Sequence, residues 1–257
     1  MKLGISYNIF DGEELLESSI KSIRDNVDYI SVVYQKVSNF GQECSPELIP
    51  LLERLHSENL IDELFEYNPR INNGGHFNEI TKRNIGLSLS EGFGCTHHMG
   101  MDSDEFYTDE QFKYMKKIMD EGDWDSSACQ MSTYYKESIY QLDPKEEYYV
   151  TLPFKIKQGK EFIMGHPFPV LVDPTRRVEP GNCRIFTRDE IEMHHMSFVR
   201  KNLSVKLNNS SAKSSFSEKI PLIVDHYSNW SFPDKVMWAS GELLTVKKVK
   251  NLFNVKF

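Results

Sequence analysis

The sequence predicts an α/β fold with a mostly parallel central sheet flanked by helices, and with a smaller antiparallel part in the second half. Two observations predict it. Up to residue 107, short β-rich segments alternate with segments whose apolar residues recur at helical spacing, as in parallel strands joined by crossover helices. After residue 107 this alternation stops, and stretches rich in Tyr, Ser and turn residues follow.

The first three predicted elements are a strand, a helix and a strand. Residues 3–7 form a short apolar strand. Asp11 stands where an N-cap is expected, with Glu14 three residues later. One face of the helix that follows is apolar, and it consists of Leu15, Leu16, Ile20 and Ile23. Residues 29–34 are rich in Tyr, Ile and Val, which favours a second strand.

A second helix begins at Ser45-Pro46, because Pro is favoured at the first helical position. Its apolar face consists of Leu48, Leu51, Leu52 and Leu55. Residues 61–67 predict a third strand.

A third helix and a fourth strand complete the first half. The glycine pair 74–75 precedes a helix over residues 78–90, and residues 95–101 predict the fourth strand. In parallel sheets, ligands bind outside the carboxyl ends of the strands. Asn8, Gln35 and Asp102 fall at these ends, so we expect the site there.

The second half begins with a helix. Thr108 and Gln111 form a predicted capping box for a helix that carries Phe112, Met115, Ile118 and Met119. Residues 126–151 predict antiparallel strands beside the site, and a proline-rich, loop-rich section follows. Residues 202–217 predict a mobile loop or a domain edge. Residues 246–257 alternate Lys with apolar residues, which predicts a docked surface element or, alternatively, peripheral membrane contact.

Composition narrows the functional class. Of 257 residues, 39% are hydrophobic and 26% are charged, as in a soluble globular protein, and we find no transmembrane segment. The chain runs straight into a strand without a signal peptide, and its four cysteines are far apart, so we expect a cytoplasmic protein with reduced thiols. The net charge of −8 argues against nucleic-acid binding, and a phosphate-bearing substrate would need local positive charge.

Asp102-Ser103-Asp104 places two carboxylates, one residue apart, on the turn that leaves the fourth strand. Such a DxD pair offers oxygen ligands to Mg²⁺ or Mn²⁺ and leaves positions open for phosphates. A second pair, Asp123-Trp124-Asp125, lies in a polar turn after Gly122. The position at the end of a buried strand therefore singles out the first pair.

The order of these parts resembles the GT-A (Rossmann-like) glycosyltransferases, particularly the family-two-like group. The resemblance covers residues 1 to about 205. It is carried by Ile5-Ser6-Tyr7-Asn8, Lys82-Arg83-Asn84-Ile85-Gly86, Met101-Asp102-Ser103-Asp104 and the His194-His195 segment through Lys201. We accordingly predict a catalytic domain over residues 1–205, with a nucleotide- and metal-binding half over 1–107 and an acceptor-side half over 108–205. Residues 206–257 form a C-terminal loop and tail.

The resemblance implies metal-dependent transfer of a hexose from a nucleotide diphosphate sugar, such as UDP-glucose, to a carbohydrate or glycoconjugate acceptor. Asp104 would bind the metal directly, and Asp102 directly or through water while it accepts a ribose hydroxyl. A third ligand would come from His194 or His195. Adjacent strand residues point to opposite faces, so only one of them reaches the ion, and the resemblance favours His195. Imidazole tilts the choice from Mg²⁺ towards Mn²⁺.

The resemblance also implies a nucleotide-sugar site. Lys82 and Arg83 would hold the nucleotide or diphosphate; the alternative is a solvated basic face paired with Glu79. Tyr7 and Asn8 would meet the base by stacking and hydrogen bonding; the alternative for Tyr7 is a core residue.

Two further positions bear on the nucleotide. Ser103 would offer its N–H or hydroxyl to ribose or phosphate. Gln35 stands where many members carry an acidic residue that contacts the nucleotide, so base recognition stays open. After the His pair, Arg200, Lys201 and Lys206 either close over the diphosphate or form a solvated loop.

Several alternatives stay open. Six carboxylates are available as a catalytic base, and no motif selects among Asp143, Asp173, Glu179, Asp189, Glu190 and Asp225. A phosphohydrolase that uses Asp102, Asp104 and His195 would act without an acceptor. A non-catalytic nucleotide-sugar or carbohydrate-binding module would bind without turnover.

Overall fold

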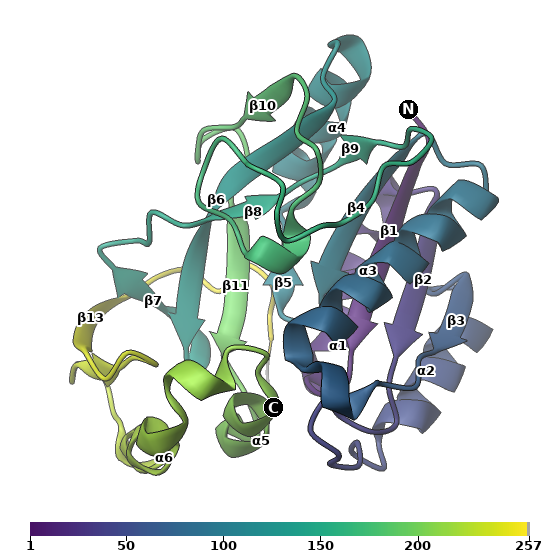
Figure 1. Cartoon of the computed structure of the whole chain (residues 1–257). Coiled ribbons are helices and arrows are strands. Elements are labelled where there is room, and N and C mark those ends of the chain that lie inside the picture. The colour runs from purple at the N-terminus through teal and green to yellow at the C-terminus, as the bar shows by residue number, and fades with distance from the viewer. Residues whose placement is uncertain (256–257) are drawn as a thin grey trace.

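The computed structural model describes residues 1–255, in which two sheets lie side by side (Figure 1). The first sheet has five strands, in the order β3 (Glu63–Glu66), β2 (Tyr29–Tyr34), β1 (Leu3–Ile9), β4 (His97–Asp102) and β9 (Phe154–Lys155). Strands β1 to β4 run parallel, and β9 pairs antiparallel with β4. This confirms the predicted mostly parallel sheet.

Helices cover both faces of the first sheet: α1 (Glu13–Ile23), α2 (Leu48–Ser57), α3 (Gly75–Gly92) and α4 (Asp109–Glu121). Alternate residues of β1 join the apolar faces of α1, α2 and α4 in one buried core, so these three helices share a face. Helix α3 lies across the other face (Figure 1).

Small residues bring α3 close to the sheet. A Cβ added to Gly86 would lie 2.1 Å from the Ser6 Oγ, and one on Gly4 would lie 2.5 Å from the Ser90 Oγ. The Ser90 Oγ is also 2.8 Å from the Nδ1 of the buried His98. The close approach sets Arg83, one turn before Gly86 in α3, beside Asp102 at the end of β4.

The starts of the first two helices correct the sequence predictions. The N-cap of α1 is Gly12 in the left-handed region (φ 83°), not Asp11, and a Cβ there would collide with the Arg200 guanidinium. Helix α2 begins at Leu48 rather than at Ser45-Pro46, because residues 45–47 form a turn in which the Leu48 N–H donates to the Ser45 carbonyl.

The predicted capping box of α4 is incomplete. Thr108 is the N-cap, but its hydroxyl donates to the Gln111 side chain, 3.1 Å away, and makes no bond to the backbone. The two side chains hydrogen-bond to each other, so neither accepts from the free backbone N–H groups at the start of the helix.

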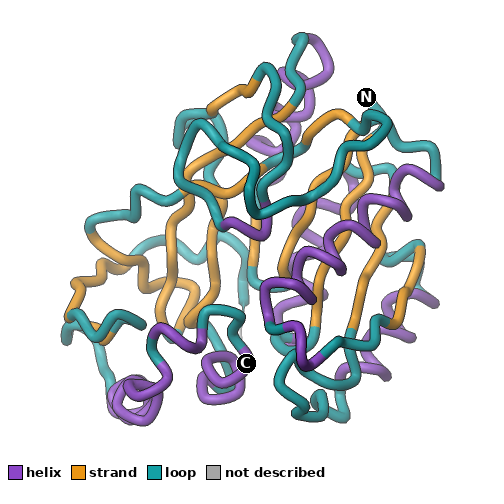
Figure 2. Tube along the Cα trace, viewed as in Figure 1, coloured by secondary structure: helices purple, strands orange, loops and turns teal. Residues whose placement is uncertain are grey.

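The second sheet has eight strands. Six follow the order β12 (Val236–Met237), β13 (Leu243–Lys248), β7 (Glu137–Asp143), β6 (Ser126–Tyr135), β11 (Met193–Phe198) and β5 (Glu105–Phe106). Two more pair with β6 off this path, β8 (Tyr149–Thr151) and β10 (Cys183–Ile185). The pairing of β6 with β7 and β8 confirms the predicted antiparallel part, whereas β6 and β11 run parallel. Figure 2 shows long loops crossing between the two groups of strands.

The segment 202–217 is not simply a loop. It begins with helix α5 (Leu203–Asn209), whose N-cap Asn202 accepts from the Val205 N–H. Leu203 and Leu207 are buried in a cluster with α6 (Ile220–Asn229), and this packing overrides the polar composition.

The end of the chain docks on the second sheet. Residues 245–248 of β13 pair with β7, so the start of the Lys-alternating segment is a docked strand. Residues 256–257 of that segment lie outside the described residues. Over residues 1–255, every helix is too short or too polar to cross a membrane.

Candidate functional site

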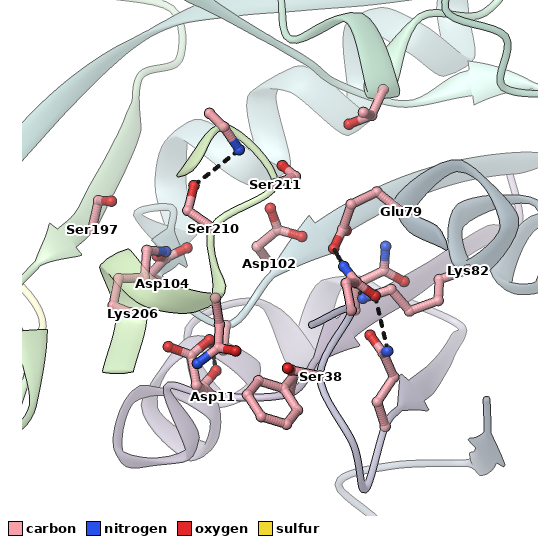
Figure 3. Close-up of a pocket in the computed structure, with 18 of the residues that line it drawn as sticks. Asp11, Ser38, Glu79, Lys82, Asp102, Asp104, Ser197, Lys206, Ser210 and Ser211 are labelled. Carbon is pink, nitrogen blue, oxygen red and sulfur yellow. Dashed lines mark hydrogen bonds and ion pairs between the residues drawn. The ribbon is translucent and has the colours of Figure 1, made fainter. Parts of the chain in front are cut away.

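A cavity of about 300 Å³ opens at the carboxyl ends of β1, β2 and β4 (Figure 3). Its wall draws on both sheets, on α3 and on the segment after α5. It is lined by polar and charged side chains, among them Asn8, Asp11, Gln35, Ser38, Asn39, Glu79, Lys82, Arg83, Asp102, Ser103, Asp104, Asp173, Thr175, His195, Ser197, Arg200 and Lys206.

Most of the residues predicted for the nucleotide and the metal line this cavity, but Tyr7 does not. Strand alternation turns Tyr7 to the face covered by α1, where its hydroxyl lies 3.1 Å from the Ser19 Oγ and its side chain is fully buried. Tyr7 therefore cannot stack on a base in the cavity. Asn8, the next residue, points the other way and does line it.

Asp102 is clamped by two arginines. The Arg83 Nη2 lies 3.3 Å from both of its carboxylate oxygens, and the Arg176 Nη2 donates to Oδ2 at 2.6 Å. Burial acts to raise the pKa of Asp102, but Arg176 and Arg83 outweigh it and lower that pKa. The lowered pKa keeps the carboxylate charged, and the side chain, 36% exposed, lines the cavity.

Arg176 couples Asp102 to the buried Glu105. It follows Asp173 in a short 3₁₀ turn (Pro174–Arg176), and it also donates to both Glu105 oxygens. Asp173 caps this turn, because its Oδ1 accepts from the Thr175 N–H at 2.7 Å and hydroxyl at 2.8 Å. The irregular segment around residue 175 therefore fixes the Asp102 side of the cavity.

Asp104 is held by a different set of cations. Its Oδ2 accepts from the Arg200 Nη2 and, at 2.7 Å, from the Lys206 Nζ. Its side chain is only 2% exposed. Burial acts to raise the pKa of Asp104, but Lys206 and Arg200 hold it well below its usual range.

The two adjacent histidines of β11 point to opposite sides, as strand alternation requires. His195 lines the cavity, and its Nε2 is 3.8 Å from the Asp104 Oδ1. His194 is buried on the other side, with its Nδ1 2.8 Å from the Tyr134 hydroxyl. Burial lowers the pKa of His195 to about 4, so its ring is neutral at neutral pH.

Polar side chains gather at the opposite end of the cavity. The Gln35 Nε2 donates to the Val37 carbonyl at 3.2 Å and to the Asn39 Oδ1 at 3.0 Å. The Asn39 amide in turn donates to Glu79, which also accepts from Lys82. These bonds fix the Gln35 amide with its oxygen free.

Buried polar atoms without a partner concentrate on the cavity wall. Within residues 1–255, such atoms on lining residues are the Asn8 Oδ1 and Nδ2, the Gln35 Oε1, the Arg83 Nε and Nη1, the Arg200 Nη1 and the Asn209 Oδ1. Unpaired buried polar groups are costly and rare in native proteins. Here they offer donors and acceptors to a polar ligand.

Other lining residues were not predicted from the sequence. Ser38 and Asn39 lie on the loop after β2, and residues 209–212 reach the cavity from the second half. Residues 38 and 39 follow the carboxyl end of a parallel strand, so their position could have predicted that this loop lines the site. The contribution of residues 209–212 depends on tertiary packing, which no local pattern carries.

A divalent cation fits only part of the predicted ligand set. Within residues 1–255, no three side chains of His, Cys, Asp or Glu converge closely enough to hold a metal by themselves. The Asp104 Oδ1 and the His195 Nε2 face each other, whereas the Asp102 oxygens accept from arginines. Asp104 and the neutral His195 therefore suit a cation whose other ligands come from substrate or water.

The remaining notable side chains lie elsewhere. His98 is bonded to Ser90, and the His97 Nδ1 lies 3.0 Å from the Thr96 hydroxyl. Asp123 and Asp125 pair with lysines on an exposed turn, as expected for the second acidic pair.

Comparisons with known proteins show the fold. No family model matches this chain, and no curated protein matches it. Among solved structures, S. aureus TarS 1-349 is similar with a TM-score of 0.50 and 13% identity, over 89% of this chain and 72% of that one. TarS 1-349 in complex with UDP-GlcNAc gives a TM-score of 0.48 and 12% identity, over 88% and 72%. The chain thus has a GT-A-like fold, with a largely parallel sheet, flanking helices and an antiparallel part.

Proposed function

We propose that this protein is a metal-dependent glycosyltransferase, which moves a hexose from a nucleotide diphosphate sugar to a carbohydrate or glycoconjugate acceptor. The observation that carries the proposal is the set of unpartnered donors and acceptors around Asp102 and Asp104, at the carboxyl edge of a parallel sheet. The donor we propose is a UDP-hexose such as UDP-glucose, which follows from the resemblance to the GT-A family.

The charge balance of the cavity supports a ligand that arrives with a cation. Five carboxylates line it (Asp11, Glu79, Asp102, Asp104 and Asp173) against four cationic side chains (Lys82, Arg83, Arg200 and Lys206). Most of these charges already pair with each other. A diphosphate therefore gains more from this wall when a divalent ion accompanies it.

Asp104 and His195 would hold the ion, Mn²⁺ or Mg²⁺, and the imidazole favours Mn²⁺. Asp102 would contribute through water or accept a ribose hydroxyl, since its oxygens already accept from arginines. When bound, the cation would offset the negative charge that grows on the departing diphosphate.

The protein's own groups would bind and orient the donor. The unpartnered N–H groups of Arg83 and Arg200 suit diphosphate oxygens, to which guanidinium groups donate strongly. Asn8 and Ser103 lie beside them and suit the ribose. The free oxygen of Gln35 suits an N–H of the base, which would replace the acidic residue of related enzymes.

The test is a calorimetric titration of UDP, GDP and CDP with Mn²⁺, on the wild type and on Asp104→Ala. The proposal predicts cation-dependent binding of UDP that is lost in Asp104→Ala. With UDP-glucose as donor, it predicts release of UDP that accelerates when an acceptor is added. Binding without turnover under any acceptor or metal would favour a binding module. Turnover with water alone, unchanged by added sugars, would favour a phosphohydrolase. Either outcome would overturn the transferase.

A further inference from the structure

Lys206 pairs with Asp104, the carboxylate that would bind the proposed cation. Its ammonium lies 2.7 Å from the Asp104 Oδ2, and its side chain is 25% exposed into the cavity (Figure 3). Arg200 shares this oxygen but is more deeply buried. It is 3% exposed, and its Nε donates to the Ser197 carbonyl. Of the two cations on Asp104, Lys206 is therefore the one that can leave.

The helix that carries Lys206 is anchored while the lysine stays free to reorient. Leu203 and Leu207 bury one face of α5. The last residue of α5 ties the helix to the loop after β2, because the Asn209 Nδ2 donates to the Gln42 Oε1 at 2.8 Å. Ser211 then leans on the start of α3, 3.0 Å from where a Gly75 Cβ would lie. A flexible four-carbon side chain thus projects from a fixed backbone beside both the cation and the diphosphate positions.

We propose that Lys206 is an exchangeable counter-ion, which neutralises Asp104 in the ligand-free protein and moves to the diphosphate when a divalent cation takes its place. This inference rests on the proposed function. Without ligand, Lys206 and Arg200 together compensate the charge of the buried Asp104 carboxylate. With ligand, the cation takes over Asp104, and the diphosphate oxygens give the ammonium a new partner.

The exchange makes cation and nucleotide bind cooperatively. Mn²⁺ alone must displace Lys206 into the cavity without a partner, so Mn²⁺ binds weakly by itself. A nucleoside diphosphate supplies that partner, so each ligand raises the affinity for the other by the same factor. Removal of the ammonium should strengthen binding of Mn²⁺ alone and weaken binding of UDP in the presence of Mn²⁺.

The experiment is an electron paramagnetic resonance titration of free Mn²⁺, with and without UDP, on the wild type, Lys206→Met and Lys201→Met. Lys201 is exposed and lies outside the lining of the cavity, as the solvated-loop alternative predicts for this residue and not as a group on the diphosphate. Lys201→Met removes the same charge there, so it is the matched control. We expect Lys206→Met to bind Mn²⁺ alone about tenfold more tightly, and UDP with Mn²⁺ about tenfold more weakly. Lys201→Met should match the wild type.

Two outcomes separate the exchange from the proposed function. If the wild type binds Mn²⁺ with UDP but Lys206→Met leaves the affinity for Mn²⁺ alone within twofold, the exchange is wrong and the transferase stands. If the wild type binds no Mn²⁺ even with UDP, the proposed function and the exchange both fail. Lys206→Gln, which keeps a polar side chain, repeats the test should Lys206→Met unfold at a lower temperature.

Discussion

Asn8 and Asp102 are direct partners in the parallel pairing of β1 and β4. This register brings the last cavity-facing residue of β1 beside the first carboxylate of the acidic pair. Both Asn8 side-chain polar atoms lack a partner within the described residues, while Asp102 accepts from Arg83 and Arg176. The two positions therefore have different roles, a free amide for a ligand and a carboxylate that organises the arginines.

Gln35 should set the preference for the base. In Gln35→Met the free oxygen that would accept an N–H from uracil is lost, so the affinity for UDP should fall about tenfold, the worth of one buried hydrogen bond. Cytosine carries no proton on the equivalent ring nitrogen, so CDP binding should hardly change. Calorimetric titration of both nucleotides with Mn²⁺ measures this. An equal loss for UDP and CDP would place the base elsewhere.

The two arginines on Asp102 should differ in what they support. Arg176 is buried between Asp102 and Glu105 and is absent from the cavity lining, so Arg176→Met should lower the free energy of unfolding by about 3–5 kcal/mol. Arg83→Met should cost less stability, because Arg176 still pairs with Asp102, but should weaken UDP binding more than about tenfold. Urea unfolding and calorimetry separate the effects. Equal stability losses would refute this division.

Gly86 should be required for the close packing of α3. The added methyl group in Gly86→Ala meets the Ser6 Oγ at 2.1 Å, so the protein should lose about 1–3 kcal/mol despite the better helix propensity of Ala. Gly92 lies at the end of the same helix with open space around its Cβ position, so Gly92→Ala is the control and should be neutral or stabilising. Chemical denaturation of both variants measures the difference. Similar stabilities would contradict the packing described here.

Stability should rise with pH between about 4 and 6.5. Burial lowers the pKa of His98 to about 3, so in this window the unfolded chain binds a proton at His98 that the folded protein does not. The free energy of unfolding therefore increases as the pH rises through this window, and it decreases as the pH falls. His98→Gln should reduce the slope at pH 5.5 by about 1 kcal/mol per pH unit. Urea titrations from pH 5 to 7 give the slope, and an unchanged slope would mean that His98 titrates normally.

The first half of the fold could be predicted because local patterns and packing agree there. Residues 29–34 form a strand as predicted, and the parallel order follows from alternating strands and helices. Helix α5 was missed because its Ser- and Asn-rich sequence favours a loop, and only the burial of Leu203 and Leu207 makes it a helix.

The location of the site could be predicted from the sequence, but the side chains that line it could be predicted only in part. A strand end and a DxD pair place Asn8, Gln35 and Asp102 at one edge, but the face of each side chain depends on register. Because side chains alternate along a strand, a shift of one position separates Asn8, which lines the cavity, from Tyr7, which does not. The pairing of Asp104 with Lys206 joins residues 102 positions apart, and no sequence spacing predicts that contact.

Anomalous diffraction from crystals soaked with Mn²⁺ and UDP tests the central claim most directly. We predict a manganese peak in coordination contact with the Asp104 carboxylate and the His195 Nε2, with the diphosphate on its open side. Diffraction that shows UDP in the cavity but no manganese beside Asp104 would contradict metal-dependent transfer by this site.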